Sequence, residues 1–211
     1  MAMARVGCGE HEGWTRLAAV SNGEHGEEPS DEALMADVAA GDRAAFATLT
    51  RRHLKRSLAL AQRIVGNAQD AEEVVQDAFL GVWRHAEGWR GGEASFGTWL
   101  YRIVVNRCLD YRRRRGFAPL EEADDLPAPA PDAYAAVAER QLAASVDTAI
   151  AALPDRQRAA LSLCYYQELT CAEAAEVMQV SVSAMESLLV RARRVLRAKL
   201  QPLIGPSGEE S

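Results

Sequence analysis

The sequence predicts an all-α protein built from two small helical domains. Apolar residues recur at spacings near 3.6, alanine is abundant, and the alternation of β-branched residues that marks strands is nearly absent. Hydrophobic residues make up 48% of the chain and charged residues 26%, which is typical of a globular protein. No apolar run approaches the roughly 18 residues of a transmembrane helix, and the N-terminal region lacks a signal-peptide core, so we expect a cytoplasmic protein.

Composition divides the 211 residues into five segments. We expect a disordered extension over 1–30, a helical domain over 31–116, a flexible acidic linker over 117–140, a second helical domain over 141–204 and a short tail over 205–211. The linker is inferred from four prolines and six acidic residues, a composition that buries too little apolar surface to fold.

Two helices are expected at the start of the first domain. Asp31 is a candidate N-cap for a short helix over 32–40, which Gly41 would end. Asp42 is a candidate N-cap for a long helix with apolar residues at helical spacing, and the Gly-Asn pair at 66–67 would end it.

The third predicted helix has an apolar face and a polar face. The polar face carries Asp70, Glu73, Gln76 and Asp77. A glycine-rich loop follows, and Ser95 is expected to cap a fourth helix from 96 to about 115. That helix combines aromatic residues with six arginines, which suits unstacked bases and a phosphate backbone. Phe96 and Trp99 are expected in the core, whereas Trp89 in the loop is the better candidate for an exposed aromatic side chain.

Two helices are expected before the last helix of the second domain. After a segment over 141–153, Pro154 is expected in the first turn of a helix with Leu161 and Tyr165 on its apolar face. Thr170 would cap the next helix, over 171–178. Four polar residues of the helix that follows Pro154 could contact phosphate or simply be solvated: Asp155, Arg156, Gln157 and Arg158. Solvation is favoured for Asp155.

The last helix, from Ser183 to about Leu200, completes a predicted helix-turn-helix. A short turn precedes it, Ala175 is small enough for two helices to cross closely, and Pro202 would end it. Gln179 stands in the turn at a position that often needs a left-handed residue such as glycine. We expect base-edge contacts from Ser183, Glu186 and Ser187, and phosphate contacts from Arg191, Arg193 and Arg194. An ordinary helical hairpin is the alternative interpretation of this segment taken alone.

The net charge of −6 hides a division of charge along the chain. Six arginines and one aspartate give 95–116 a charge of +5, and five cations and one glutamate give 181–204 a charge of +4. The acids gather in 66–94 and in the linker. An acidic average argues against nucleic-acid binding, but two compact basic blocks indicate two surfaces with separate partners. We expect the linker to compete for these basic faces, so that the free protein binds DNA weakly.

The sequence predicts no metal site, no cofactor and no small-molecule substrate. Its cysteines form no CxxC pair, its four histidines are scattered, and no glycine-rich phosphate loop is present. A free cysteine in an apolar helical pattern behaves as a small hydrophobic residue. The cysteines are Cys8, Cys108, Cys164 and Cys171.

Three motifs in order resemble the extracytoplasmic-function (ECF) group of bacterial RNA polymerase sigma factors. DAEEVVQDAFLGVW at 70–83 resembles its polymerase-binding segment, and FGTWLYRIVVNRCLDYRRRR at 96–115 resembles its −10-element segment. The stretch 153–200 resembles its −35-binding region. The resemblance covers roughly 31–200 and is far more specific than a single helix-turn-helix.

The resemblance implies partners and residue roles. A factor of this group binds core RNA polymerase, through the β′ and β subunits, directs it to promoter DNA, and is usually held inactive by an anti-sigma factor that is often membrane-bound. Asp70, Glu73, Gln76 and Asp77 would meet the clamp helices of β′, and the linker would thread toward the polymerase active-site cleft. The melted −10 strand would be taken by Trp89, Arg90, Ser95, Thr98, Arg102, Asn106, Arg107, Arg112, Arg113, Arg114 and Arg115.

The recognition helix departs from the pattern of the group. The group commonly has Thr-Val-Lys-Ser-Arg where this chain has Ala-Met-Glu-Ser-Leu at 184–188. Glu186 therefore replaces a cation and Leu188 replaces another. Because Glu can accept a hydrogen bond from cytosine but cannot bind phosphate, we expect a −35 sequence different from the common one.

Two other functions compete with this interpretation. A stand-alone helix-turn-helix regulator would account for 153–200 but would leave 70–83 and 96–115 without a purpose, and it would bind duplex DNA tightly without polymerase. A helical enzyme or metalloprotein is disfavoured because no carboxylate pair or histidine cluster has catalytic or metal-binding spacing.

Overall fold

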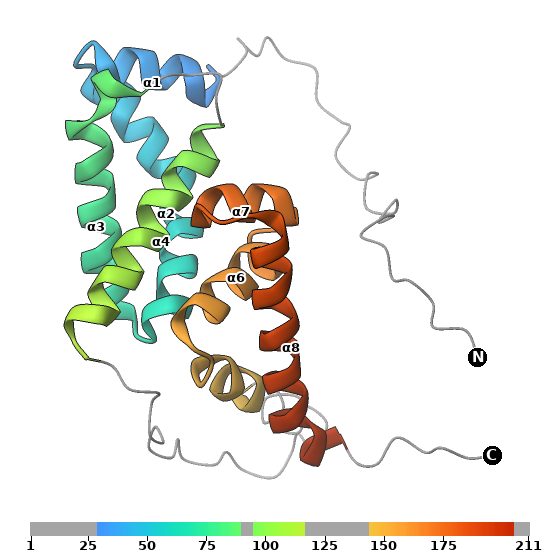
Figure 1. Ribbon diagram of the computed structural model, residues 1–211. Coiled ribbons are helices and arrows are strands. Elements are labelled where there is room, and N and C mark those ends of the chain that lie inside the picture. Colours follow the sequence, from blue (N-terminus) through green and yellow to red (C-terminus); the bar gives the residue numbers. More distant parts are fainter. Residues whose placement is uncertain (1–28, 90–94, 117–143, 205–211) are drawn as a thin grey trace, which may run out of the picture.

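The computed structural model describes residues 29–89, 95–116 and 144–204, and the regular elements in those ranges are all helices (Figure 1). The predicted all-helical class is confirmed for this part of the chain. No helix within it is long and apolar enough to cross a bilayer. The predictions of a disordered extension, a flexible linker and a tail fall almost wholly outside these residues. The elements are α1 (Asp31–Ala39), α2 (Arg43–Val65), α3 (Ala68–Arg84), a 3-10 turn (Ala86–Gly88), α4 (Phe96–Arg114), helical residues 144–151, α6 (Asp155–Tyr166), α7 (Cys171–Met178) and α8 (Val182–Ile204).

Local capping sets the boundaries of the first three helices. Asp42 caps α2 as expected, with its carboxylate accepting from the amides of residues 44 and 45. Gly66 ends α2 in the left-handed region, at φ +101°. The expected cap of α1 is wrong: the Ser30 hydroxyl caps that helix, because the Asp31 carboxylate is engaged by Arg52 and His53 of α2.

The first four helices form a bundle in which α1 crosses one end of α2, α3 and α4 (Figure 1). Ser95 caps α4, as expected, by accepting from the Thr98 amide. The apolar stripes of α2, α3 and α4 meet in a shared core, because their apolar residues recur three and four apart. Fully buried members of this core include Leu49, Leu60, Ile64, Val82, Phe96, Leu100 and Val104.

The second domain contains the predicted helix-turn-helix, made of α7 and α8. Thr170 and Glu173 form a capping box at the start of α7, and Ala175 is buried at the helix crossing. Gln179 adopts the left-handed conformation that its place in the turn was expected to need, at φ +53°. The last helix is longer than predicted, because it begins at Val182 and continues past Pro202 to Ile204.

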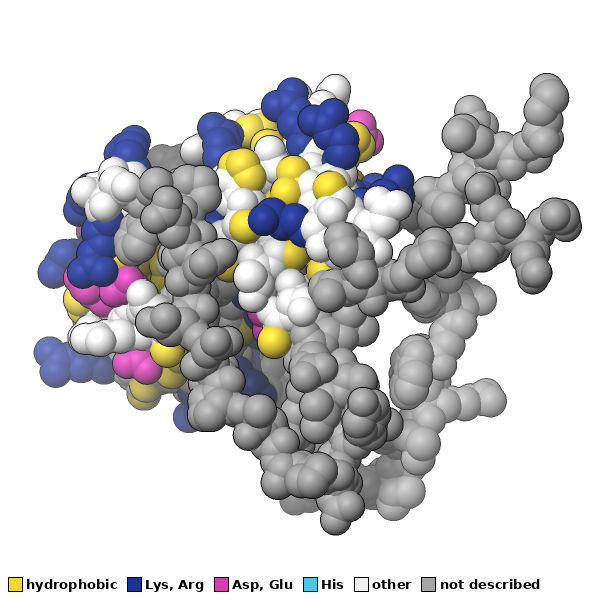
Figure 2. Space-filling model, turned by 90° about the horizontal axis from the view of Figure 1, so that it is seen from below, with side chains coloured by type: hydrophobic (Ala, Val, Ile, Leu, Met, Phe, Trp, Pro, Cys, Tyr) yellow, Lys and Arg dark blue, Asp and Glu magenta, His cyan; other side chains and the backbone are white. Residues whose placement is uncertain are grey.

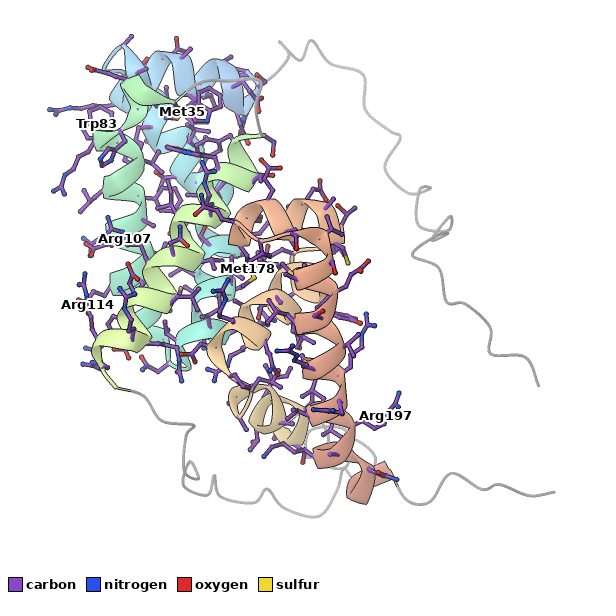
Figure 3. The ribbon with its side chains drawn as sticks, viewed as in Figure 1. Met35, Trp83, Arg107, Arg114, Met178 and Arg197 are labelled. Carbon is purple, nitrogen blue, oxygen red and sulfur yellow. The ribbon has the colours of Figure 1, made fainter. Side chains whose placement is uncertain are left out.

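The two domains pack directly on each other. Helix α6 lies against α2 and α7 lies against α4, and residues of both domains belong to one continuous apolar core. Met178 of α7 is buried in that core, and Figure 3 shows it between α7 and α4. The sequence predicted two domains joined by a linker and did not predict this contact.

We expect Gln179→Gly to raise the free energy of unfolding by up to about 1 kcal/mol. A left-handed residue with a Cβ costs about 1–2 kcal/mol, and glycine removes this strain at the expense of about 0.5–1 kcal/mol of chain entropy. Gln179→Val should lower stability by about 1–2 kcal/mol, because a β-branched side chain tolerates this conformation worst. Urea unfolding followed by circular dichroism measures both.

The matched control is Lys55→Gly, which places glycine in the exposed interior of α2. This change should lower stability by about 1 kcal/mol. An equal loss in Gln179→Gly would contradict the assignment of strain to the turn.

Candidate nucleic-acid and protein-binding surfaces

Helix α3 presents a polar face made of Glu73, Gln76 and Asp77, all exposed. Asp70, predicted on the same face, is only 7% exposed. Its carboxylate accepts from the side-chain amide of Asn67 at 2.5 Å and from Arg115 of α4 at 3.3 Å. Asp70 is therefore not part of the exposed polar face. Its side chain instead contacts Asn67 at the start of α3 and Arg115 at the end of α4.

An apolar groove of about 480 Å³ runs beside this polar face, between α2 and α3. Leu54 and Leu80 line it and are exposed, and Glu72 and Gln76 stand at its polar side. Exposed leucines beside carboxylates suit a partner helix with apolar and basic residues. The exposure of these leucines was not predicted from the sequence, although their positions on the outer sides of two amphipathic helices were a usable signal.

The predicted DNA contacts in and around α4 differ in how exposed their side chains are. Thr98 and Arg112 are buried, Trp89 and Arg102 are half-buried, and Arg90 lies outside the described residues. The remaining residues are exposed: Ser95, Asn106, Arg107, Arg113, Arg114 and Arg115. The exposed set concentrates cations in the last turns of the helix, where they also suit the negative end of the helix dipole.

The expectation of an exposed Trp89 is wrong. Its ring lies 6.5 Å from that of Trp99, and both rings pack against the core. Phe96 is fully buried, as expected, and lies 6.0 Å from Trp99. These three rings form an aromatic cluster at the start of α4.

Arg112 lies at the contact between the domains. It is 2% exposed, donates from Nη1 to the carbonyl of Val65 at 3.1 Å, and pairs with Asp155 of α6. Arg158, which the sequence left open between phosphate contact and solvation, is 1% exposed and donates to the carbonyl of Ile64 at 2.9 Å. Neither interpretation of Arg158 holds in this arrangement, because the side chain is inside the protein.

Helix α8 presents one continuous exposed face. Five of the six predicted residues stand three or four apart along it, and Val190 completes the stripe with 61% exposure. Val190 was missed because a valine in an amphipathic helix is expected in the core. The stripe is Ser183, Glu186, Ser187, Val190, Arg191 and Arg194.

Arg193 lies beside this stripe and has a partner. Its Nε donates to the hydroxyl of Tyr165 at 2.9 Å, and its guanidinium stands 5.7 Å from the Tyr165 ring centroid. The expectation that Tyr165 forms part of the apolar face of α6 is wrong, because the residue is 54% exposed. A surface tyrosine instead orients an arginine next to the exposed stripe of α8.

The basic residues lie on separate surfaces of the molecule. Figure 3 places Arg107 and Arg114 on the α3 side of α4, and Arg197 on α8 at the opposite side of the molecule. Figure 2 views the molecule from the end where α4 and α8 finish, and there Lys and Arg are far more frequent than Asp and Glu on the described surface. The arrangement agrees with two basic surfaces rather than one.

The described side chains form no cluster that could hold a metal ion. Within 29–89, 95–116 and 144–204, no group of three or more His, Cys, Asp or Glu could hold a metal ion. Burial raises the pKa of Cys108 to about 12, which keeps its thiol protonated and unreactive.

Both domains match known protein families. Residues 49–117 match Sigma-70 region 2, and residues 143–196 match Sigma-70, region 4. The first match contains α3 and α4, and the second contains the helix-turn-helix.

Similar proteins span most of the chain. The ECF RNA polymerase sigma factor SigM of Mycobacterium tuberculosis is 37% identical over 178 residues, which cover 84% of this chain and 86% of that protein. The ECF RNA polymerase sigma factor SigE of Mycolicibacterium smegmatis is 35% identical over 179 residues, 81% of this chain and 69% of that protein. The ECF RNA polymerase sigma-E factor of Escherichia coli is 32% identical over 189 residues, 84% of this chain and 98% of that protein.

Solved structures resemble most of the chain. CnrH, in complex with the cytosolic domain of CnrY, is 30% identical with a TM-score of 0.61 and is matched over 82% of this chain and 97% of its own. The sigma factor RpoE of Bartonella quintana, in complex with the anti-sigma factor NepR, has a TM-score of 0.58 over 74% of this chain and 96% of its own. At 21% identity the second likeness concerns the fold alone.

We expect Asp70→Asn to lower stability at neutral pH and to have little effect in acid. Interaction with the Tyr111 hydroxyl lowers the pKa of Asp70, with further lowering from Asn67 and Arg115, against the opposing effect of burial. A carboxylate with a lowered folded-state pKa stabilises the protein above its unfolded pKa of about 3.9, and this stabilisation is lost as the pH falls through the folded-state value.

The difference in free energy of unfolding between wild type and Asp70→Asn should therefore shrink as the pH drops from 7 to below 4. Urea unfolding at several pH values measures it, with the exposed Asp77→Asn as control. A gap that stays constant over this range would show that Asp70 acts through packing and not through its charge.

Proposed function

The chain belongs to the ECF group of sigma-70 RNA polymerase sigma factors. We propose that its three binding functions lie on three different exposed helix faces. Sigma factors are not enzymes, so the chemistry to explain is binding. In this proposal α3 binds core RNA polymerase, α4 takes the melted −10 strand, and α8 reads the −35 duplex. The observation that carries the proposal is the separation of charge, since the exposed face of α3 is acidic and those of α4 and α8 are basic.

The proposed polymerase surface combines charge with apolar area. Glu73 and Asp77 supply carboxylates that steer a basic partner, and Gln76 links them to the groove between α2 and α3. Leu54 and Leu80 offer apolar anchors of the kind that carry most binding energy in an interface. The clamp helices of β′ are the proposed occupant.

The proposed −10 surface uses the exposed side of α4. Arg113, Arg114 and Arg115 would hold the phosphates of the separated strand, and Arg107 and Asn106 stand one to two turns earlier on exposed positions. Extruding a base from a duplex costs a few kcal/mol, so a protein must recover this by stacking and hydrogen bonds. The half-buried Trp89 and Trp99 rings at the start of α4 would supply an aromatic surface for stacking.

The proposed −35 surface is the exposed stripe of α8. Its first residues lie near the helix N-terminus, the part of a recognition helix that usually reaches base edges. Glu186 is suited to accept from the N4 amine of cytosine, and Val190 offers an apolar contact to a thymine methyl group. Arg191 and Arg194 would bind phosphates and set the position of the helix without reading sequence.

An anti-sigma factor is the proposed regulator. CnrH is 30% identical to this chain and was solved with the cytosolic domain of CnrY. A partner that covers the α3 face would compete directly with polymerase, and this form of control requires no change in the sigma factor itself. We place the proposed activity in the cytoplasm, where polymerase and promoter DNA are found.

In vitro transcription with core RNA polymerase and a promoter library tests the proposal. Added wild-type protein should produce promoter-dependent transcripts, and a complete absence of transcripts would refute the proposed function. Tight binding of the purified chain to duplex DNA, with no effect of polymerase, would instead favour a stand-alone helix-turn-helix regulator.

The double variant Glu73→Arg, Asp77→Arg should bind core polymerase at least about tenfold more weakly, because two attractive charges become repulsive. Its helix content by circular dichroism should not change, since both side chains are exposed. The control is Asp37→Arg, an equally exposed acid on α1. Wild-type affinity in the double variant would refute the polymerase surface on α3.

Glu186→Ala should abolish a preference for cytosine at one position of the −35 element, because alanine has no acceptor for the N4 amine of the base. Loss of one specific base contact changes discrimination by about 1–3 kcal/mol, or roughly 5- to 150-fold. Sequencing of transcripts from a randomised −35 library measures this change. Arg194→Ala is the control and should weaken all promoters alike; an unchanged base preference in Glu186→Ala would remove Glu186 from the reading face.

A further inference from the structure

Arg193 is held at the surface of α8 by a tyrosine from another helix. Its Nε donates to the hydroxyl of Tyr165 at 2.9 Å, and its guanidinium carbon stands 5.7 Å from the centroid of the Tyr165 ring. Both residues are exposed, and Tyr165 is the next-to-last residue of α6. The contact therefore forms where both partners remain open to a ligand.

This contact uses only part of the hydrogen-bonding capacity of the pair. A guanidinium has five N–H donors, and Nε carries one of them. No other described residue accepts a hydrogen bond from Arg193, and no carboxylate in the described part of the chain forms an ion pair with it. The Tyr165 hydroxyl accepts from Nε, so its own O–H can still donate. The pair thus offers a positive charge and several donors to an anion.

The stability of α8 does not explain why an arginine stands at this position. Cations stabilise a helix in its last turn, near the negative end of the dipole, but Arg193 lies in the middle of Val182–Ile204. Arg197 stands four residues later, and two exposed cations at this spacing repel each other. From 187 to 204 the sequence contains five cations and no acid. An anionic partner would remove this repulsion.

The position of Arg193 along α8 suits a phosphate better than a base. It follows Glu186 by two turns on the same side of the helix, so the two positions are about 10 Å apart along the axis. The major groove of B-form DNA is about 12 Å wide. A helix that places Glu186 at a base edge therefore brings Arg193 to the phosphates at the wall of the groove.

Tyr165 prepares Arg193 for this contact. An arginine loses rotamer entropy when it is fixed on a phosphate, and this loss weakens binding. The ring and hydroxyl of Tyr165 already hold the guanidinium, with Nε turned to the tyrosine and the terminal nitrogens left for a ligand. A guanidinium can donate two parallel hydrogen bonds to two oxygens of one phosphate. Part of the entropy loss therefore occurs before DNA binds.

We propose that Tyr165 and Arg193 form a binding site for one phosphate of the DNA backbone beside the −35 element. This inference rests on the proposed function of α8 and extends the DNA-binding surface to α6. Arg193 supplies the charge and the paired hydrogen bonds, while Tyr165 orients it and donates its own O–H to the same phosphate. The site adds affinity and fixes how α8 enters the groove, without reading sequence.

Neutralising one phosphate at a time tests the site. The full-length chain with core RNA polymerase is bound to a promoter identified in the transcription assay, with single phosphates in and beside the −35 element replaced by uncharged methylphosphonates. One replacement should weaken wild-type binding roughly tenfold, the effect of losing a charge-assisted hydrogen bond. The same replacement should have little further effect in Arg193→Ala, because the contact is already lost. If every replacement acts equally on both proteins, the proposal is overturned.

Variants of Tyr165 separate a binding role from a structural one. Tyr165→Phe keeps the ring and removes the hydroxyl, so it should weaken promoter binding roughly threefold to tenfold, but not when Arg193 is already alanine. Tyr165→Glu would preserve a purely structural tie between α6 and α8, because a carboxylate also pairs with Arg193. A phosphate site requires the opposite result, at least about tenfold weaker binding, because the new charge repels DNA. Wild-type promoter binding in Tyr165→Glu would refute the site.

The control is Tyr166→Phe, which removes the hydroxyl of the adjacent residue of α6. The Tyr166 ring lies against the guanidinium of Arg63 of α2, 3.8 Å from its centroid, and not against α8. This variant should bind promoter DNA as wild type does. A loss equal to that of Tyr165→Phe would contradict a specific role of the Tyr165 hydroxyl.

Transcription by the wild-type chain keeps the two proposals distinct. If it produces promoter-dependent transcripts and Arg193→Ala retains every phosphate sensitivity, this inference fails and the proposed function stands. If it produces no promoter-dependent transcripts, the proposed function fails and the phosphate site fails with it.

Discussion

The structure depends on how the end of α2 is satisfied. Gly66 turns the chain sharply there, and the carbonyls of Ile64 and Val65 are left without donors inside the helix. Two arginines supply the donors, and because Arg112 and Arg158 belong to different domains, the interaction that completes one helix also joins the two halves of the molecule. Leaving a buried carbonyl without a donor costs more free energy than a typical hydrogen bond contributes to stability. The end of α2 therefore strongly favours the arrangement in which the two domains pack on each other.

The net charge of −6 describes none of the surfaces of this sigma factor. Exposed acids gather on α3 at Glu72, Glu73 and Asp77, whereas exposed arginines gather at the end of α4 and along α8. Long-range electrostatics acts through local surfaces and not through the sum over the chain. An acidic protein can therefore carry two basic faces, provided that its acids are separated from them along the chain and in space.

Helix boundaries were predictable because capping is a local interaction. Asp42, Ser95 and Thr170 cap the helices that the sequence assigned to them, and the left-handed turn at Gln179 stands where the helix-turn-helix pattern required it. Asp31 failed as a cap because residues of α2, more than 20 positions away, engage its carboxylate. A contact between residues distant in the sequence also explains the exposure of Tyr165, because Arg193 of α8 donates a hydrogen bond to its hydroxyl.

The sequence by itself determined the helices, most of their caps, the family and the order of the polymerase- and DNA-binding motifs, because periodicity, capping and motif spacing are read from neighbouring residues. Only the tertiary structure decided which polar residues are available on the surface. Asp70, Arg112 and Arg158 look like exposed charges in the sequence, yet all three are buried, because their partners lie 45, 47 and 94 residues away. Contacts between residues so far apart in the sequence leave no local periodic signal. The interface between the two domains could therefore be seen only in the tertiary structure.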